Sequence, residues 1–274
     1  MVKFSAVFCS DATHLSCAFS HLSGRFEKHL GLTGGSLGLG YFSGDDVLLV
    51  RRPLYQSGSL ESLVSRAVSN HLIVSIEDKP PSGFKIESTP PFRYRNFLGV
   101  FSVSEQLPAP LVTEIMSDLP AFLQRDMRSD SDAELLFYLF LACLFDMGRL
   151  QSQSLRINFI MEGLRSVFGV FQRFFEREGA QQTKLCACVT NGQHMVAGTL
   201  GFPLQMLTLN GLDPCPRCSD QRRTPWMDER RVSHPHCSVV SFVNAQEPLE
   251  GFVRVRDRDI IGVDPQGGIV SIEI

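Results

Sequence analysis

The sequence of 274 residues lacks a strong excess of charge of either sign and lacks a long hydrophobic run. Its net charge of -3 and pI of about 6.2 do not indicate a nucleic acid or a membrane surface as a partner. The most apolar run, from Leu135 to Phe145, is too short to span a bilayer and predicts a buried helix. The first residues hold no long apolar segment, which argues against a signal peptide.

A disulfide framework is also not indicated, although the sequence contains eight cysteines. In a chain without a secretory signal, thiols are usually reduced or bind a metal, so we expect a cytoplasmic protein. Hydrophobic residues make up 43% of the chain, enough for a sizeable core. No internal repeat or low-complexity tract divides the sequence, and we expect a single domain over residues 1–274.

Hydrophobic periodicity predicts strands in both end regions of the chain and long helices in the middle. Strands are expected at 1–9, in a hairpin over 37–52, and at 71–77, 96–103, 184–190, 195–197, 239–243 and 260–274. Helices are expected at 60–70, 110–125, from Ser131 onward, and at 157–177. This order is typical of an α+β protein with segregated layers. The phenylalanine-rich helix at 157–177 is expected to face the core or a second copy in a homo-oligomer.

Several segments carry a resemblance to one family: Met1-Val2, the glycine-rich run 35–42, Ser75-Ile76-Glu77, Phe101-Ser102-Val103 and Ser131-Asp132-Ala133-Glu134. In this order they resemble the class II glutamine amidotransferases, in a stand-alone bacterial branch related to γ-glutamyl hydrolases. There the motifs read Met-Cys, Asp-Gly-Trp-Gly-Ile-Gly-Phe-Tyr, His-x-Arg, His-Asn-Gly and Thr-Asp-Ser-Glu. The resemblance implies the four-layer αββα sandwich of N-terminal-nucleophile (Ntn) hydrolases.

The positions that carry the chemistry in that family are altered here. Its nucleophile is the cysteine at position 2, where Val2 has no nucleophilic atom. Glu77 stands in place of the arginine that grips the substrate carboxylate, which reverses the charge. Ser102 and Val103 replace the Asn and Gly of the oxyanion hole. Asp132 keeps the acid that meets the substrate ammonium, although an aspartate there is also a common helix cap.

The resemblance therefore implies a catalytically inactive pseudoenzyme with a binding, scaffolding or regulatory role, whose partner is a protein or a small ligand. The alternative is an active amidohydrolase that cleaves a γ-glutamyl-type amide with a non-standard nucleophile. Cys9 and Cys17 are the nearest thiols to the start of the chain, and Ser5 and Ser10 the nearest hydroxyls. Neither serine has a base at an evident spacing.

A second group of residues indicates a metal. Residues 210–238 are expected to form an inserted loop that contains Cys215-Pro-Arg-Cys218, followed by His234, His236 and Cys237. Thiolates and an imidazole are typical zinc ligands, and we favour Cys215, Cys218, Cys237 and one of the two histidines for a structural Zn²⁺. The alternatives are a surface loop with reduced thiols and a redox-active CxxC motif.

Overall fold

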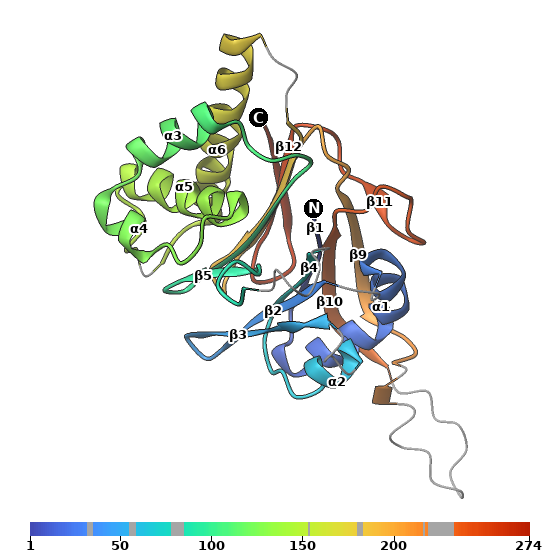
Figure 1. Ribbon diagram of the computed structural model, residues 1–274. Coiled ribbons are helices and arrows are strands. Elements are labelled where there is room, and N and C mark those ends of the chain that lie inside the picture. The colour runs from blue at the N-terminus through green and yellow to red at the C-terminus, as the bar shows by residue number, and fades with distance from the viewer. Residues whose placement is uncertain are drawn as a thin grey trace, which may run out of the picture.

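A computed structural model has two antiparallel β-sheets packed face to face, with helices on both outer sides (Figure 1). The structure describes residues 1–31, 35–54, 59–77, 85–152, 154–179, 183–215, 217–218 and 233–274. Within these ranges no helix is both long and apolar enough to cross a membrane. The expected α+β class and the four-layer αββα arrangement are confirmed.

The first sheet has seven strands in the order β11-β9-β10-β1-β4-β2-β3. Strand β1 lies in its centre and pairs antiparallel with both β10 and β4. The bounds are β1 Val2–Cys9, β2 Ser36–Ser43, β3 Asp46–Pro53, β4 His71–Glu77, β9 Gln205–Leu212, β10 His234–Val243 and β11 Val253–Arg254.

The second sheet has six strands in the order β13-β12-β8-β7-β6-β5. Its neighbours are antiparallel throughout the named strands. The bounds are β5 Phe92–Tyr94, β6 Phe97–Val103, β7 Leu185–Thr190, β8 Met195–Leu200, β12 Asp259–Val263 and β13 Ile269–Glu273.

The helices cover the two outer faces. A short 3-10 turn at Ala12–His14 leads into α1 (Leu15–Leu30), which with α2 (Leu60–Val64) packs on the seven-stranded sheet. On the six-stranded sheet lie α3 (Ala109–Asp118), α4 (Ala121–Asp126), α5 (Asp132–Asp146) and α6 (Ile157–Glu178).

The side chains of β1 alternate between the space between the two sheets and the layer of α1. Phe4 and Phe8 point between the two sheets, while Val7 and Cys9 face the α1 side. Successive side chains of a strand point to opposite faces, so β1 contributes to two hydrophobic clusters at once. As a result, the first strand of the chain is buried on both sides.

Helix α1 was not expected, although its sequence contains the signal. Leu15, Phe19, Leu22, Phe26 and Leu30 are fully buried and recur at helical spacing. The helix ends at Gly31, whose φ of 64° is a left-handed conformation that glycine adopts without strain. Because this helix was missed, the place of Cys17 on it was missed as well.

Other boundaries also differ from expectation. The helix expected at 60–70 ends at Val64, and the one expected at 110–125 is divided at Pro120, which has no N–H for a helical hydrogen bond. Strand β9 was not expected. The strand expected at 260–274 is a hairpin of β12 and β13 that turns around Asp264, whose carboxylate accepts hydrogen bonds from the N–H groups of Gln266 and Gly268.

Ser131 and Glu134 have the spacing of a helix capping box, but only one of its two hydrogen bonds forms at the start of α5. The Ser131 Oγ accepts a hydrogen bond from the Glu134 N–H at 3.4 Å. The Glu134 carboxylate does not return to the Ser131 N–H. It instead accepts hydrogen bonds from the N–H groups of Arg128 (3.0 Å) and Ser129 (2.6 Å). Glu134 therefore fixes the chain just before α5, with its charge near the positive end of the helix.

Candidate functional site

A cavity of about 470 Å³ lies beside the start of β1. Val2, Glu77, Val103 and Asp132 all line it, so the structure brings together four of the five residues that the resemblance had grouped. Val2 and Glu77 are direct partners across the β1–β4 ladder. Val103 ends β6, and Asp132 begins α5. Both sheets and a helix of the outer layer thus meet at this point.

Ser102, the fifth residue of that group, lies behind the cavity. Its side chain is fully buried, and its Oγ donates a hydrogen bond of 2.6 Å to the Val2 carbonyl. The same carbonyl accepts a bond of 2.9 Å from Asn244 Nδ2, while Asn244 Oδ1 accepts one of 2.7 Å from the Phe4 N–H. Ser102 therefore positions the backbone of β1 and does not face a bound substrate. Asn244 was missed, because only the folded chain brings position 244 next to β1.

Asp132 is the first residue of α5, and the N-cap is Ser131. The Asp132 Oδ2 accepts a hydrogen bond of 2.9 Å from the Leu107 N–H. This bond ties the segment that precedes α3 to the start of α5. Asp132 is thus not the helix cap that its sequence position also allowed, and its carboxylate remains on the cavity wall.

The charged side chains of the cavity are mostly acidic. Glu77, Glu105, Asp130 and Asp132 line it, and within the described lining Lys85 is the one basic side chain. Carboxylates that line a cavity repel an anionic ligand and attract a cationic one. This balance is unfavourable for the α-carboxylate of an amino acid.

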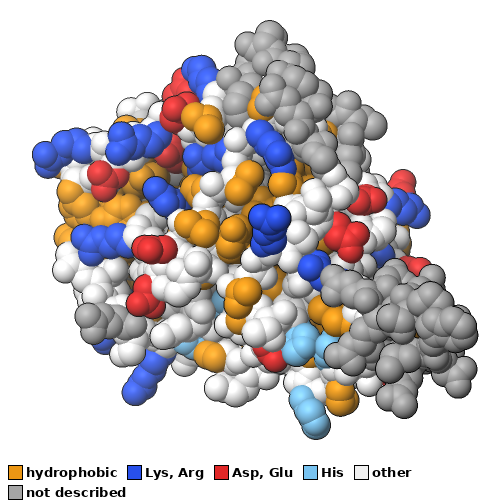
Figure 2. All heavy atoms as spheres, turned by 90° about the horizontal axis from the view of Figure 1, so that it is seen from below, with side chains coloured by type: hydrophobic (Ala, Val, Ile, Leu, Met, Phe, Trp, Pro, Cys, Tyr) orange, Lys and Arg blue, Asp and Glu red, His pale blue; other side chains and the backbone are white. Residues whose placement is uncertain are grey.

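A larger cavity of about 750 Å³ lies between the β2–β3 hairpin and the helices α4 and α5. Its lining is mixed and combines apolar side chains with four arginines and three acids, Arg51, Arg93, Arg95, Arg128, Glu87, Asp126 and Glu134. Figure 2, which views the molecule from below, shows hydrophobic, basic and acidic side chains intermingled on the visible face. The Arg51 guanidinium donates to the carbonyls of Ile86 (3.1 Å) and Pro91 (2.7 Å), so it already stabilises the protein's own backbone.

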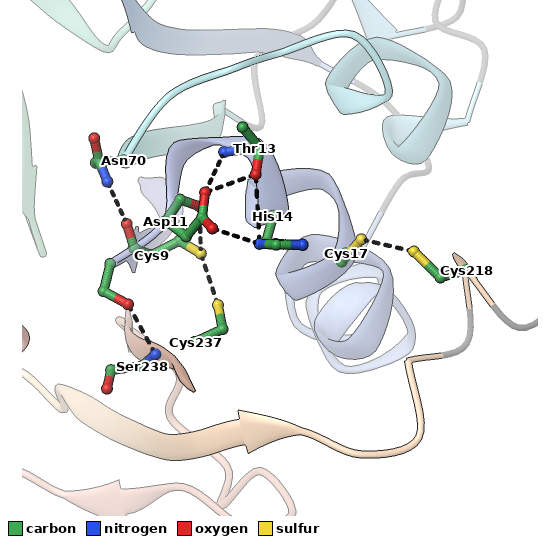
Figure 3. A network of polar contacts seen from close by, with 10 residues as sticks. Cys9, Asp11, Thr13, His14, Cys17, Asn70, Cys218, Cys237 and Ser238 are labelled. Carbon is green, nitrogen blue, oxygen red and sulfur yellow. Dashed lines mark hydrogen bonds and ion pairs between the residues drawn. The ribbon is translucent and has the colours of Figure 1, made fainter. Parts of the chain in front are cut away.

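A cluster of possible metal ligands forms at the other end of β1. The ligand atoms of Cys17, Cys215, Cys218 and His234 all lie within 4.8 Å of one another. Three of these residues were expected as zinc ligands. The fourth is Cys17 on α1, which Figure 3 shows next to Cys218, with 3.6 Å between the two sulfur atoms.

Cys237 and His236, which were also expected as metal ligands, do not belong to this group of four side chains. The Cys237 Sγ lies 3.2 Å from the Cys9 Sγ, and both thiols are buried (Figure 3). His236 is exposed on β10. The physical reason is an irregularity in the β9–β10 pairing between His234 and Ser238, which changes the simple alternation of side chains along this strand.

Neither thiol weighed as a substitute nucleophile reaches the cavity beside Val2. Cys9 ends β1, roughly 20 Å along the strand from Val2. Its hydrogen bond with Cys237 and its burial raise the pKa of Cys9 far above the usual thiol range, so it stays protonated. Cys17 belongs to the group of possible metal ligands with Cys215, Cys218 and His234, called the thiol cluster below. Ser5 is fully buried, and Ser10 Oγ accepts from the Ser238 N–H at 2.9 Å.

The strands β9 and β10 extend into the loop expected at 210–238. Residues 210–212 belong to β9, and residues 234–238 belong to β10. The connection between them is therefore 213–233. Of this connection, residue 216 and residues 219–232 lie outside the described part of the chain.

Comparison with known proteins identifies the fold. The sequence matches no model of a protein family and no curated protein. A glutamine aminotransferase class-II domain protein from Silicibacter pomeroyi is similar in structure, with a TM-score of 0.56 and 12% identity over 99% of this chain and 98% of that one. A predicted glutamine amidotransferase from Pseudomonas aeruginosa PA01 gives a TM-score of 0.54 and 13% identity over 98% of both chains.

A longer enzyme shares the same fold over part of its length. The glutamine phosphoribosylpyrophosphate amidotransferase from B. subtilis gives a TM-score of 0.53 and 11% identity, and the match covers 99% of this chain but 49% of that one. This chain thus spans about half of that enzyme. At such low identities the likeness concerns the fold alone, and the fold of this chain is that of class II glutamine amidotransferase structures.

Proposed function

We propose that this protein is a catalytically inactive relative of the class II glutamine amidotransferases, and that its cavity beside Val2 binds a small cationic ligand. The observation that carries the proposal is that Val2 lines the cavity together with Glu77 and Asp132. An aliphatic side chain cannot form the thioester that cleavage of glutamine by this route requires. Removal of Met1 would not change this argument, because the Val2 side chain is inert whether Met1 is present or absent.

The other side chains of the cavity supply no activated nucleophile. Three serine hydroxyls line it, and each is hydrogen-bonded to the main chain. Ser88 Oγ donates to the Lys85 carbonyl, Ser104 Oγ accepts from the Lys184 N–H, and Ser131 Oγ accepts from the Glu134 N–H. A serine nucleophile is activated by a side-chain base that accepts its hydroxyl proton, whereas the hydrogen bonds of these three hydroxyls in the described structure are with main-chain groups. The described lining also contains no cysteine.

The size and charge of the cavity favour binding of a small molecule. A volume of about 470 Å³ lies in the usual range for ligand pockets. Glu77, Glu105 and Asp132 favour an ammonium or another cationic group over a carboxylate. The cavity remains open where both sheets meet α5, and this supports a binding role over a purely scaffolding one.

We expect the purified protein to release no ammonia from glutamine or γ-glutamyl amides above a blank without protein. The Val2→Cys variant is expected to stay at the blank level as well, because a thiol alone restores neither the grip on the carboxylate nor the oxyanion donor. Ammonia release is measured by a coupled assay. Turnover by the wild-type chain that persists through further purification would overturn the proposal.

Labelling with an electrophilic glutamine analogue separates this proposal from the alternative of a non-standard nucleophile. After incubation, mass spectrometry of peptides is expected to find no adduct on cysteine, serine or threonine. A stoichiometric adduct on one residue of the Val2 cavity would instead establish the active amidohydrolase.

We expect the diamine putrescine to raise the melting temperature at low ionic strength, and the dicarboxylate glutarate to leave it unchanged. The reason is the excess of carboxylates around the cavity. The Glu77→Gln variant is expected to reduce the putrescine effect at least about threefold, while Glu162→Gln on the exposed face of α6 serves as the matched control. A larger shift with glutarate than with putrescine would contradict the proposed ligand class.

A further inference from the structure

Four side chains of the thiol cluster come from three separate parts of the fold. Cys17 lies on the first turn of α1, Cys215 and Cys218 follow β9, and His234 begins β10. Their ligand atoms all lie within 4.8 Å of one another. A tetrahedral Zn²⁺ with Zn–S bonds of about 2.3 Å holds two sulfur ligands roughly 3.8 Å apart. The separation of 3.6 Å between the Cys17 and Cys218 sulfurs is close to that value.

We propose that Cys17, Cys215, Cys218 and His234 bind one structural Zn²⁺ ion. Three thiolates and one imidazole form a common tetrahedral donor set for zinc, and they are too soft for Mg²⁺ or Ca²⁺. With four protein ligands the ion has no open position for a substrate or a reacting water. The site therefore stabilises structure and is not part of the cavity beside Val2.

The two cysteines of the CxxC motif contact each other, and the residue between them that the structure describes, Arg217, contacts the helix layer. The Cys218 N–H donates to the Cys215 Sγ at 3.5 Å, so the sulfur is oriented by its own turn. Arg217, between the two cysteines, donates from Nη2 to the Ser65 carbonyl at 2.9 Å, just beyond α2. This bond holds the turn against the helix layer independently of the thiols.

The histidine ligand also contacts a second histidine. The His14 ring lies against the His234 ring, with 4.0 Å between the ring centroids. The His14 Nδ1 is in turn 2.8 Å from the Asp11 Oδ2, as Figure 3 shows. Residues that orient a metal-bound histidine are a regular part of zinc sites. The turn that precedes α1 thus supports His234 while α1 supplies Cys17.

A disulfide is the main competing fate of these thiols. The 3.6 Å between the Cys17 and Cys218 sulfurs is much longer than a disulfide bond of about 2.05 Å, and Cys215 is close to both. A disulfide between any two of the three cysteines would leave too few thiolates for zinc. A chain with such a disulfide cannot bind zinc at this site, so a single experiment distinguishes the disulfide from the zinc site.

The test uses the full chain purified without added zinc, with bound metal measured by elemental analysis. We expect about one equivalent of zinc per chain. Cys17→Ser, Cys218→Ser and His234→Ala are expected to reduce it at least about fivefold, whereas His234→Cys keeps it because a fourth thiolate replaces the imidazole. Cys237→Ser and His236→Ala are matched controls that keep full occupancy.

Retention of zinc by Cys17→Ser together with its loss in Cys237→Ser would overturn the proposed ligand set. A metal-free wild-type chain would overturn the site itself, and so would a disulfide found by mass spectrometry. If a variant does not fold, alkylation of the wild-type chain decides. Cys17, Cys215 and Cys218 are expected to react only after a chelator removes the metal, and equal reactivity before and after chelation would contradict the proposal.

Discussion

Replacing Gly38 with Ala is expected to lower the free energy of unfolding by roughly 3 kcal/mol or more. A Cβ atom at Gly38 on β2 would lie only 1.7 Å from the Pro90 carbonyl oxygen. That oxygen cannot move away easily, because it accepts a hydrogen bond of 2.6 Å from Ser75 Oγ, and Arg51 donates to the next carbonyl, that of Pro91. The clash is therefore between backbone groups that are fixed from several sides.

Gly24→Ala is the matched control, because Gly24 is exposed within α1 and a Cβ there meets no atom within 4 Å. This variant is expected to be more stable than the wild type by about 0.5 to 1 kcal/mol. Urea unfolding followed by circular dichroism measures both. A Gly38→Ala protein within about 0.5 kcal/mol of the wild type would show that the Pro90 segment repacks freely.

Acidification is expected to destabilise the fold through His71. This side chain is buried, lies against Phe8 and Phe42, and its Nδ1 is 2.9 Å from Thr190 Oγ1. Burial, and to a smaller extent the nearby His194, lower the pKa of His71 from 6.5 to about 3. Between about pH 6.5 and pH 3, His71 is therefore protonated in the unfolded chain but neutral in the folded chain.

It follows that stability falls as the pH decreases through this window, by an amount on the order of 4 kcal/mol from His71 alone. Unfolding in urea at pH 7 and pH 4.5 measures the slope. The His71→Gln variant, which cannot be protonated, is expected to lose most of the difference between the two pH values, while His236→Gln on the exposed face of β10 keeps it. An unchanged slope in His71→Gln would assign the acid sensitivity to other groups.

The strands and helices with long apolar stretches were predictable from the sequence. Strands β1 and β4, which are buried along almost their whole length, were predicted almost to the residue, and the phenylalanine spacing predicted α6. Boundaries set by single residues were predicted less well, as at Pro120. Strand β9 was missed although the signal is present: Leu207, Thr208, Leu209 and Asn210 alternate between apolar and polar with a period of two.

The residues of the two candidate sites were predictable from the sequence to different extents. The Val2 cavity was predictable because a family resemblance aligned Val2, Glu77 and Asp132 in order along the chain. The four proposed metal ligands were only partly predictable. Local spacing identifies Cys215 and Cys218 but carries no information about a partner nearly 200 residues earlier. Cys17 needed the recognition of α1 and of its packing on β1, which spacing in the second half of the chain cannot reveal.

The central place of β1 has a consequence for synthesis of the chain. Of its two neighbours in the sheet, β4 and β10, β10 is synthesised later. The two strands are far apart in sequence: Ser241 Oγ donates a hydrogen bond to the Ala6 carbonyl across a separation of 235 residues. Until the ribosome has produced β10, the first strand can pair with β4 but has an open edge toward the missing neighbour. Fragments that end before residue 234 should therefore aggregate, and completion of this sheet should be a slow, late event in folding.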